Sequence, residues 1–263
     1  FQEYSLQGLI VIGGNGTMEG AHHLAYEHAL PVVGIPASID NDIGLTREAI
    51  GVDTALNTIV EACDRISDTA TSHHRAFVVE VMGRNSGYLA MAASVATAAD
   101  AVLLPEQGRT SDEVVKSVVD VLRRSFAASR EKKRVLILKA EGVEVSTETL
   151  VNRVKEEMGG DPEVEIRATI LGHLVRGGNP SFRDRLLAGR FGLVAVHGLL
   201  DGHSDVMTGW NVDGDGIQTS DSWIKLFAIT DVLAETEALL DGTSQVTADR
   251  VRRMEDIQGV LSI

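Results

Sequence analysis

The chain has 263 residues, of which 44% are hydrophobic and only 4% aromatic, and its formal net charge at pH 7 is −14. Its acidity argues against nucleic acid and anionic membrane surfaces as partners, and no apolar run reaches the roughly 18 residues of a membrane span. The lone Cys63 excludes an intrachain disulfide and is consistent with a reducing cytoplasm.

In chain order, apolar runs of strand length alternate with amphipathic helical patterns, which predicts a doubly wound, mainly parallel sheet. Strands are expected at residues 9–13, 32–35, 76–81, 101–104 and 135–138. Helices are expected at residues 17–29, 46–67, 87–98, 111–128, 147–158 and 184–200, with Ser111 as the N-cap of the fourth. Residues 203–263 mix a short strand, a turn rich in Gly and Asp, and further helices.

Two predicted strands are followed by loops that suit phosphoryl transfer. Strand 9–13 runs into the glycine-rich loop, Gly13-Gly14-Asn15-Gly16-Thr17, where a helix begins and backbone N–H groups favour an anion. Strand 32–35 runs into the acid loop, Pro36-Ala37-Ser38-Ile39-Asp40-Asn41-Asp42-Ile43-Gly44, which carries two carboxylates two residues apart. Ligands bind outside the carboxyl ends of parallel strands, so the two loops predict a phosphoryl-transfer site. The structural alternatives are a ligand-free tight turn and a polar Asx-capped turn.

Five sequence blocks occur in the order found in the 6-phosphofructokinase family. GGNGT and PASIDND resemble that family's GGDG(S/T) and P-x-(T/S)-I-D-N-D. The other blocks are Ser72-His73-His74-Arg75, Glu80-Val81-Met82-Gly83-Arg84, and Arg167-Ala168-Thr169 through Gly172-His173-Leu174-Val175-Arg176-Gly177-Gly178. Each block alone is a weak signal, but five in order identify the chain as a member of this family.

The resemblance implies two Rossmann-like, three-layer αβα subdomains with mainly parallel sheets, between which the chain crosses more than once. On this interpretation residues 1–51 and 177–225 bind the phosphoryl donor, and residues 52–176 and 226–263 bind the sugar phosphate. The helix at 46–67 is the first crossing. The family carries a further strand–loop–helix region before this point, so the chain is expected to be an N-terminally incomplete copy.

Asp40 is the expected general base. A partly desolvated carboxylate at a strand end can take the proton of an attacking hydroxyl, and the resemblance gives the first aspartate of I-D-N-D the same role. The resemblance places Ser38 near the transferring phosphate. Asp42 is expected to orient a metal-bound water or a neighbouring side chain.

The donor phosphates are expected to bind at Gly14, Asn15, Gly16 and Thr17. The family usually has aspartate at the position of Asn15, where it helps to hold Mg²⁺, and a neutral amide is a weaker ligand for a hard dication. On one interpretation Asn15 coordinates Mg²⁺ through its carbonyl oxygen or through water. On the other, Asn15 lowers activity.

An anionic sugar phosphate is repelled by the average surface of so acidic a chain, so its site needs local arginines. The resemblance assigns Arg75 and Arg167 to the sugar 6-phosphate, reaching across a subunit interface, and Arg84 to the transferring phosphate. The remainder of the implied sugar-phosphate site is Ser38, Asp40, Asp42, Met82, Gly83, Glu141, His173 and Arg176.

The predicted activity is transfer of the γ-phosphoryl group of Mg·ATP to the 1-hydroxyl of fructose 6-phosphate, by a cytoplasmic homotetramer with shared sites. Pyrophosphate-dependent relatives tend to carry aspartate in place of Gly16 and lysine in place of Ala37, so ATP is favoured as donor. A pyrophosphate-dependent enzyme and a non-catalytic regulatory subunit are the alternatives.

An allosteric effector site is a further expectation from the resemblance. The basic residues Arg130, Lys132 and Lys133, together with Asp100, occupy positions that bind effectors in bacterial members. Ser67, however, stands where an effector arginine is expected, so a solvated basic cluster is the other interpretation.

Overall fold

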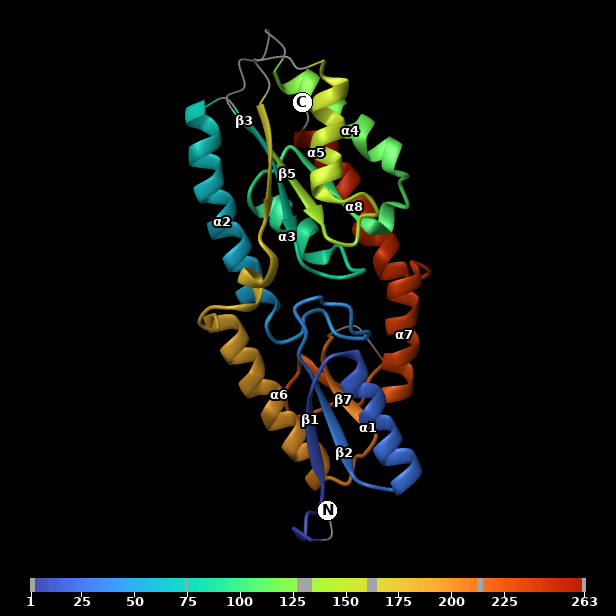
Figure 1. Cartoon of the computed structure of the whole chain (residues 1–263). Helices are drawn as coiled ribbons and strands as arrows, with labels where there is room; N and C mark the ends of the chain where they lie inside the picture. Colours follow the sequence, from blue (N-terminus) through green and yellow to red (C-terminus); the bar gives the residue numbers. More distant parts are fainter. Residues whose placement is uncertain (1–2, 74, 127–133, 160–164, 212–214, 262–263) are drawn as a thin grey trace. The chain divides into compact units, whose positions relative to one another are not determined.

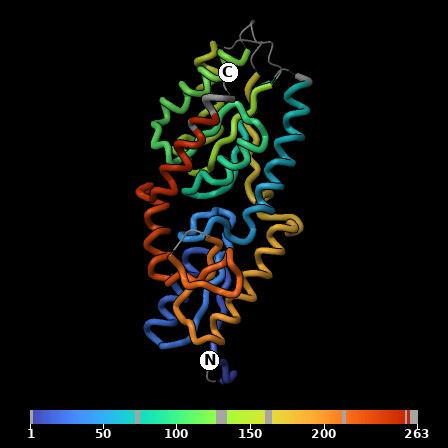
Figure 2. Tube along the Cα trace, turned by 180° about the vertical axis from the view of Figure 1, so that it is seen from behind, coloured from blue at the N-terminus to red at the C-terminus, as the bar shows by residue number. Residues whose placement is uncertain are grey.

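The computed structural model describes residues 3–73, 75–126, 134–159, 165–211 and 215–261 (Figure 1). Within these residues the chain has two four-stranded sheets, one in each of two compact units. Unit 1 comprises residues 1–54 and 179–246, and unit 2 comprises residues 55–178 and 247–263. The chain enters unit 2 within α2 (Val52–His73) and enters it again at the start of α8 (Gln245–Leu261). The path of the chain can be followed from behind in Figure 2. No helix in the described ranges combines the length and apolar character needed to cross a membrane.

Unit 1 is a three-layer sandwich built on a mainly parallel sheet. Its elements are β1 (Leu9–Gly13), α1 (Asn15–His28), β2 (Val32–Pro36), α6 (Phe182–Leu200), β7 (Val206–Trp210), β8 (Ile224–Ala228) and α7 (Ile229–Asp241). The strand order is β1-β2-β7-β8, and β8 alone of these runs antiparallel to its neighbour. Val33 packs with Phe191 of α6, whereas a Cβ at Gly34 would lie 2.6 Å from the Met18 sulfur of α1. Successive residues of a strand face opposite sides, so α6 and α1 cover opposite faces.

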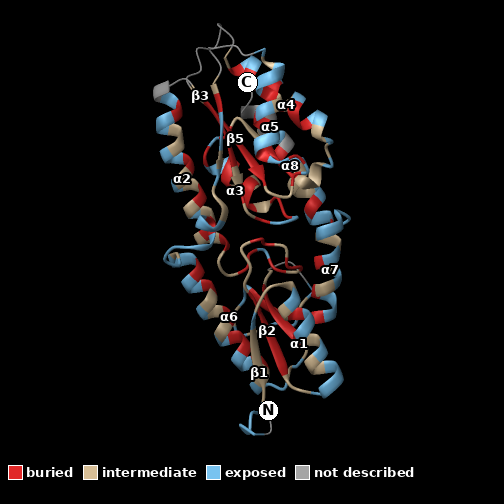
Figure 3. Ribbon diagram, viewed as in Figure 1, coloured by how far each residue is buried: buried red, intermediate tan, exposed pale blue. Residues whose placement is uncertain are grey.

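Unit 2 is built on a sheet whose described strands are all parallel. Its elements are β3 (Arg75–Val81), α3 (Tyr88–Ala96), β4 (Ala101–Leu103), η1 (Pro105–Gln107), α4 (Ser111–Ser125), β5 (Arg134–Ala140), α5 (Thr147–Glu157), β6 (Glu165–Ile170) and η2 (Gly172–Arg176). The strand order is β4-β5-β3-β6. β3 and β5 are almost wholly buried, as Figure 3 shows, and the edge strand β6 is mostly accessible. The prediction of α/β units with mainly parallel sheets is confirmed.

The apolar pattern predicts a helix from residue 46, but helix α2 begins at Val52. Gly51 has a φ of +103°, a conformation that favours glycine and lies outside a right-handed helix. The Asp184 carboxylate accepts hydrogen bonds from the N–H groups of Gly51 at 2.8 Å and Thr54 at 2.9 Å, so it caps the helix. The cap lies 130 positions along the chain from Thr54, which local sequence patterns cannot show.

Two further differences concern α4 and β6. The N-cap of α4 is Thr110 in place of the expected Ser111. The Thr110 hydroxyl accepts from the Glu113 N–H at 3.4 Å, and the Glu113 carboxylate accepts from the Thr110 N–H at 2.8 Å, which is a capping box. β6 is not among the predicted strands. Only Ile166 of its six residues is buried, so it lacks the pattern of a buried strand.

Residues 226–246 lie in unit 1, and so not with the predicted sugar-phosphate part. β8 pairs with β7 along its whole length, and α7 contacts both α1 and β8. The Gly44 N–H of the acid loop also donates to the buried Thr236 hydroxyl of α7 at 2.8 Å. These contacts bind α7 to the same sheet as β1 and β2.

Candidate active site

The glycine-rich loop and the acid loop are neighbours because the strands before them are parallel and in register. Leu9 pairs with Val32 and Gly13 with Pro36, so β1 and β2 end at the same level. The Ala37 N–H donates to the Gly13 carbonyl at 2.9 Å, which extends the pairing into the loops. Both loops therefore lie at the carboxyl edge of the unit 1 sheet, where open α/β sheets bind ligands.

The glycine-rich loop forms the N-terminus of α1. Gly14 is the N-cap, with φ −89° and ψ −162°, and the helix starts at Asn15, two residues before the predicted start. The Met18 N–H donates to the Gly14 carbonyl at 3.1 Å. A Cβ at Gly16 would meet no atom within 4 Å, so the space beside this residue is open. The loop thus combines the positive end of a helix dipole with room for a ligand.

Asp40 and Asp42 of the acid loop have different surroundings. Asp40 is buried, with 6% of its surface exposed, whereas Asp42 is half-buried. Ser38 connects them, since its Oγ accepts from the Asp40 N–H at 3.3 Å and donates to Asp42 Oδ1 at 3.5 Å. A desolvated carboxylate beside a phosphate loop suits proton transfer, and a more accessible one suits a cation or water.

Asn15 and Asp42 join the two loops. The Asn15 Nδ2 donates to Asp42 Oδ2 at 2.9 Å. The other end of the same amide, Asn15 Oδ1, is buried and accepts no hydrogen bond from the described residues. Carboxylate and amide oxygens are ligand types that Mg²⁺ uses when substrate phosphates and water complete its shell, and Asp42 and the Asn15 carbonyl oxygen supply one of each.

Asn41, which is not among the predicted site residues, fixes the acid loop. It is 2% exposed and has a φ of +48°, which Asn adopts more readily than most residues. Its Nδ2 donates to the Arg47 carbonyl at 3.0 Å, and its Oδ1 accepts from the Ala49 N–H at 3.0 Å. Asn41 thereby sets the backbone on which Asp40 and Asp42 are carried.

In unit 2 a second group of expected residues follows the carboxyl ends of three adjacent strands. The 82–84 turn follows β3, Glu141 follows β5, and η2 follows β6 with His173 and Arg176. The Glu141 N–H donates to the Val81 carbonyl at 3.0 Å, which shows that β3 and β5 end together. The parallel sheet thus gathers these residues at one edge.

Glu141 holds the turn that carries Arg84. Its Oε1 accepts hydrogen bonds from the N–H groups of Arg84 at 2.6 Å and Gly83 at 3.1 Å. Gly83 has a φ of +150° and Arg84 a φ of +50°, so the turn depends on these bonds and on glycine. A Cβ at Gly142 would lie 2.2 Å from the Arg84 carbonyl oxygen, so the loop after β5 also requires its glycine.

A buried ion pair lies just before the carboxyl ends of β3 and β5. Lys139 is 1% exposed, and its Nζ lies 3.1 Å from Glu80 Oε2, which also accepts from the Thr147 hydroxyl. Removing one partner of such a pair leaves an uncompensated buried charge. The signal in the sequence is a lysine in the otherwise apolar run Val135-Leu136-Ile137-Leu138-Lys139-Ala140, a feature that is not among the predicted site residues.

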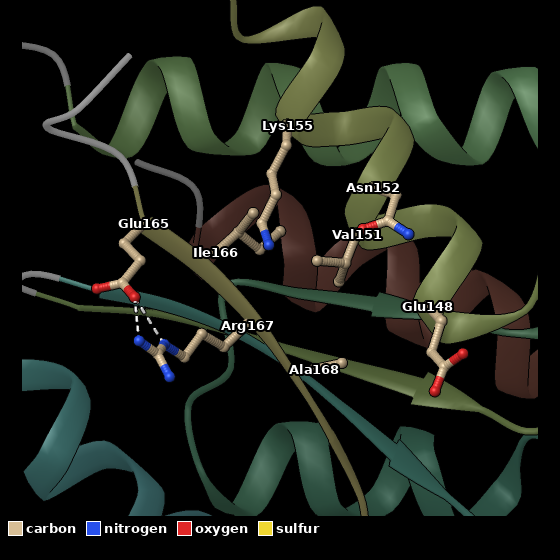
Figure 4. A pocket seen from close by; sticks show the side chains of 8 residues that line it. All are labelled: Glu148, Val151, Asn152, Lys155, Glu165, Ile166, Arg167 and Ala168. Atoms are coloured by element: carbon tan, nitrogen blue, oxygen red, sulfur yellow. Dashed lines mark hydrogen bonds and ion pairs between the residues drawn. The ribbon is translucent and has the colours of Figure 1, made fainter. Parts of the chain in front are cut away.

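Arg75 and Arg167, here called the arginine clamp, share a single carboxylate. Arg75 and Glu165 are the first residues of β3 and β6 and pair in register. Glu165 Oε2 binds Arg75 Nε. Its Oε1 binds Arg167 through Nε at 2.7 Å and through Nη2 (Figure 4). Hydrogen bonds from Arg75, and then from Arg167, hold the pKa of Glu165 below its usual value. Glu165 and Arg167 line a pocket of about 500 Å³ between α5 and β6.

The expected sugar-phosphate residues of unit 2 thus form two separate groups. Arg75 begins the seven-residue strand β3, and Arg84 follows the end of that strand. A strand of that length spans about 20 Å. The arginine clamp and Arg84 therefore lie toward opposite ends of β3.

The expected effector residues are partly described. The Asp100 carboxylate accepts from the Leu136 N–H at 2.8 Å, and the Ser67 hydroxyl accepts from Arg134 Nη1 at 2.9 Å. Arg130, Lys132 and Lys133 lie outside the described residues. The effector site stays a prediction.

A sequence model described as phosphofructokinase matches residues 1–199, which include both loops of unit 1 and both arginine groups of unit 2. The chain belongs to the phosphofructokinase family. The resemblance found in the five sequence blocks is therefore confirmed.

Curated phosphofructokinases resemble the chain closely over much of its length. The ATP-dependent 6-phosphofructokinase of Thermotoga petrophila is 47% identical over 206 residues, which cover 78% of this chain and 61% of the relative. The ATP-dependent 6-phosphofructokinase 1 of Thermus thermophilus is 43% identical over 215 residues, which cover 81% of this chain and 63% of the relative. The chain thus spans less than two thirds of these phosphofructokinases.

Solved phosphofructokinase structures share the fold. The phosphofructokinase of Saccharomyces cerevisiae matches 97% of this chain and 37% of its own, with a TM-score of 0.81 and 29% identity. A pyrophosphate-dependent phosphofructokinase from Marinobacter aquaeolei matches 88% of this chain and 61% of its own, with a TM-score of 0.71 and 20% identity. The second likeness concerns the fold alone.

Asn41→Ala should lower the free energy of unfolding by about 2–3 kcal/mol. It leaves the buried Ala49 N–H unsatisfied and places alanine at positive φ. Asn41→Gly should cost about 1–2 kcal/mol, because glycine accepts that φ and only the hydrogen bonds are lost. Urea unfolding measures both variants, with the exposed Asn152→Ala of α5 as the control, expected within about 0.5 kcal/mol of wild type. Equal stability of all three variants would show that Asn41 does not hold the loop.

Proposed function

We propose that the protein is an ATP-dependent 6-phosphofructokinase, which transfers the γ-phosphoryl group of Mg·ATP to the 1-hydroxyl of fructose 6-phosphate. The products are fructose 1,6-bisphosphate and ADP. The observation that carries the proposal is the buried Asp40, which follows β2 beside the helix N-terminus that follows β1. The names of the curated relatives support the same activity. The single cysteine, Cys63, is buried and suits a reaction that takes place in the cytoplasm.

In the proposed reaction Asp40 accepts the proton of the attacking 1-hydroxyl. Phosphoryl transfer needs little covalent help from a protein, so positioning and charge stabilisation dominate. Ser38 lies between Asp40 and Asp42 and contacts the transferring group, while Arg84 offsets its charge. The phosphates of the donor lie over Gly14, Gly16 and Thr17 at the start of α1.

Asn15 and Asp42 are the residues proposed to hold Mg²⁺, which neutralises charge on the donor phosphates when it is bound. The carbonyl oxygen of Asn15 is buried and has no described hydrogen-bond donor. The Asn15 amide nitrogen donates a hydrogen bond to the Asp42 carboxylate, so this carboxylate has a partner without a cation. This arrangement fits weak metal binding supplemented by phosphate and water ligands.

ATP is the proposed donor because the space beside Gly16 is open. A larger side chain there would reduce the room for a nucleotide. Pyrophosphate is the alternative donor.

The acceptor site is proposed to be shared between copies of the chain. The carboxyl ends of the unit 2 strands carry the 82–84 turn, Glu141, His173 and Arg176. Arg75 and Arg167 lie toward the amino ends of β3 and β6. If both groups contact one sugar phosphate, the arginine clamp acts on the site of a second subunit. An assembly of at least two copies follows, and the family resemblance favours a homotetramer.

Product formation with ATP and with pyrophosphate, measured in parallel with Mg²⁺ and fructose 6-phosphate, tests the proposal. Fructose 1,6-bisphosphate is expected with ATP. Asp40→Asn should lower kcat by about 10³-fold and change KM for fructose 6-phosphate by less than about threefold, because it removes the base and keeps the shape.

Asp201→Asn, an exposed change at the end of α6, is the control and should leave both constants unchanged. A pure KM effect of Asp40→Asn would remove Asp40 as the base. Product with pyrophosphate alone would reassign the donor. A folded protein that binds fructose 6-phosphate but gives no product would be a non-catalytic subunit.

Asn15→Asp should make the thermal stability of the protein dependent on Mg²⁺. It sets a second carboxylate against Asp42, where the amide now lies 2.9 Å away, so repulsion should lower the unfolding midpoint in EDTA by about 2–4 °C. Added Mg²⁺ should restore the midpoint, and turnover at low Mg²⁺ should rise. Asn179→Asp, an exposed change of the same charge in unit 1, is the control. Equal behaviour of the two variants would exclude a metal role for position 15.

Two inactive variants should restore activity when mixed. Arg75→Ala and Arg84→Ala each damage a different half of a shared site, so a hybrid pair contains one intact site and one doubly altered site. Random reassembly after mild dissociation should return about one quarter of wild-type activity. Two preparations of the same variant, treated identically, are the control. Absence of recovery in verified hybrids would place both arginines outside a shared site.

A further inference from the structure

Glu165 occupies the anion position of the arginine clamp. Its two carboxylate oxygens are divided between the guanidinium groups, Oε2 to Arg75 and Oε1 to Arg167. Arg167 uses both Nε and Nη2, the pair of donors with which an arginine grips a phosphate side-on. Each donor bound to Glu165 is therefore withheld from any other anion.

The sheet itself places this carboxylate. Glu165 lies opposite Arg75 in the parallel pairing of β6 with β3, and Arg167 lies two residues further along β6. Residues i and i+2 of a strand project on the same side, so all three side chains share one face. The contact is built into the strand register and does not depend on a loop.

The contact is also weak enough to exchange. The side chains of Arg167 and Glu165 are 52% and 40% exposed, and that of Arg75 is 23% exposed. Ion pairs with such access to water contribute little net stability. A dianion brings twice the charge of a carboxylate to the same two guanidinium groups, so it can replace Glu165, whereas a monoanion gains little by doing so.

We infer that Glu165 is a built-in competitor that sets the affinity and the charge selectivity of the arginine clamp, so that binding of a phosphate dianion proceeds by displacement of this carboxylate. The inference rests on the proposed function, in which the clamp receives the 6-phosphate of the sugar. Glu165 is then a specificity-determining residue: it disfavours singly charged anions relative to phosphate dianions.

The test is fructose 6-phosphate binding to the full chain by calorimetry at pH 8, where the sugar phosphate is a dianion. Glu165→Gln keeps the shape and removes the charge, and the dissociation constant should fall about three- to tenfold. Glu148→Gln makes the same charge change in an exposed residue of the same pocket that neither arginine contacts, and should alter affinity less than twofold. Inorganic phosphate should show the same order of affinities, and nitrate should bind measurably to Glu165→Gln alone.

An unchanged or weakened affinity in Glu165→Gln would overturn the inference, since it would make Glu165 neutral or a support that orients the arginines. Glu165→Asp, whose shorter side chain withdraws from both guanidinium groups, should also tighten binding and serves if the first variant unfolds. Arg75→Gln and Arg167→Gln distinguish failure of the proposed clamp from failure of the competitor role of Glu165. If they leave fructose 6-phosphate binding unchanged, the proposed clamp fails. If they weaken it while Glu165→Gln does not tighten it, the clamp stands and the competitor role fails.

Discussion

Parallel pairing between neighbouring strands is the constraint on which the candidate site depends. Parallel strands in register end at the same level, so loops that are distant in sequence meet at one edge. In unit 1 this brings the glycine-rich loop after β1 beside the acid loop after β2, close enough for the hydrogen bond between Asn15 and Asp42. In unit 2 it brings the turn after β3 onto Glu141 after β5. The same backbone arrangement thus assembles one group of candidate residues in each unit.

Strong local patterns explain which features could be predicted from sequence. β1 and β2 are apolar runs followed by glycine-rich and carboxylate-rich loops, and their positions follow from those residues. The family follows from the five sequence blocks in order. The start of α2 could not be predicted, because its cap comes from Asp184 on a distant helix. The edge strand β6 lacks the continuous apolar run that marks a buried strand. The residues that hold the loops of the site could not be predicted either, because the hydrogen bonds of Asn41 and Glu141 form only on folding.

Carboxylates pair with the two clamp arginines and with the buried lysine of this acidic chain. With a net charge of −14, a cluster of unpaired arginines would attract the protein's own acidic surface, and each described clamp arginine is indeed paired with Glu165. The buried Lys139 is paired in the same way with Glu80. On the inference drawn above, anion binding at the arginine clamp is an exchange of partners, and long-range steering by the negative surface does not assist it. Local geometry then decides which anion is accepted.

The position of the exchange within the sheet connects it with assembly. β6 is an edge strand, and Arg167 on it is half exposed, so its guanidinium can reach another chain without disturbing the core. Arg84 is carried by a turn that follows the central strand β3 and is held by Glu141 of the same unit, so it is suited to a site within its own chain. If the acceptor site is shared as proposed, binding of the sugar phosphate exchanges an internal ion pair for a contact between subunits. The release of Glu165 and the engagement of a neighbouring copy are then one event, and each favours the other.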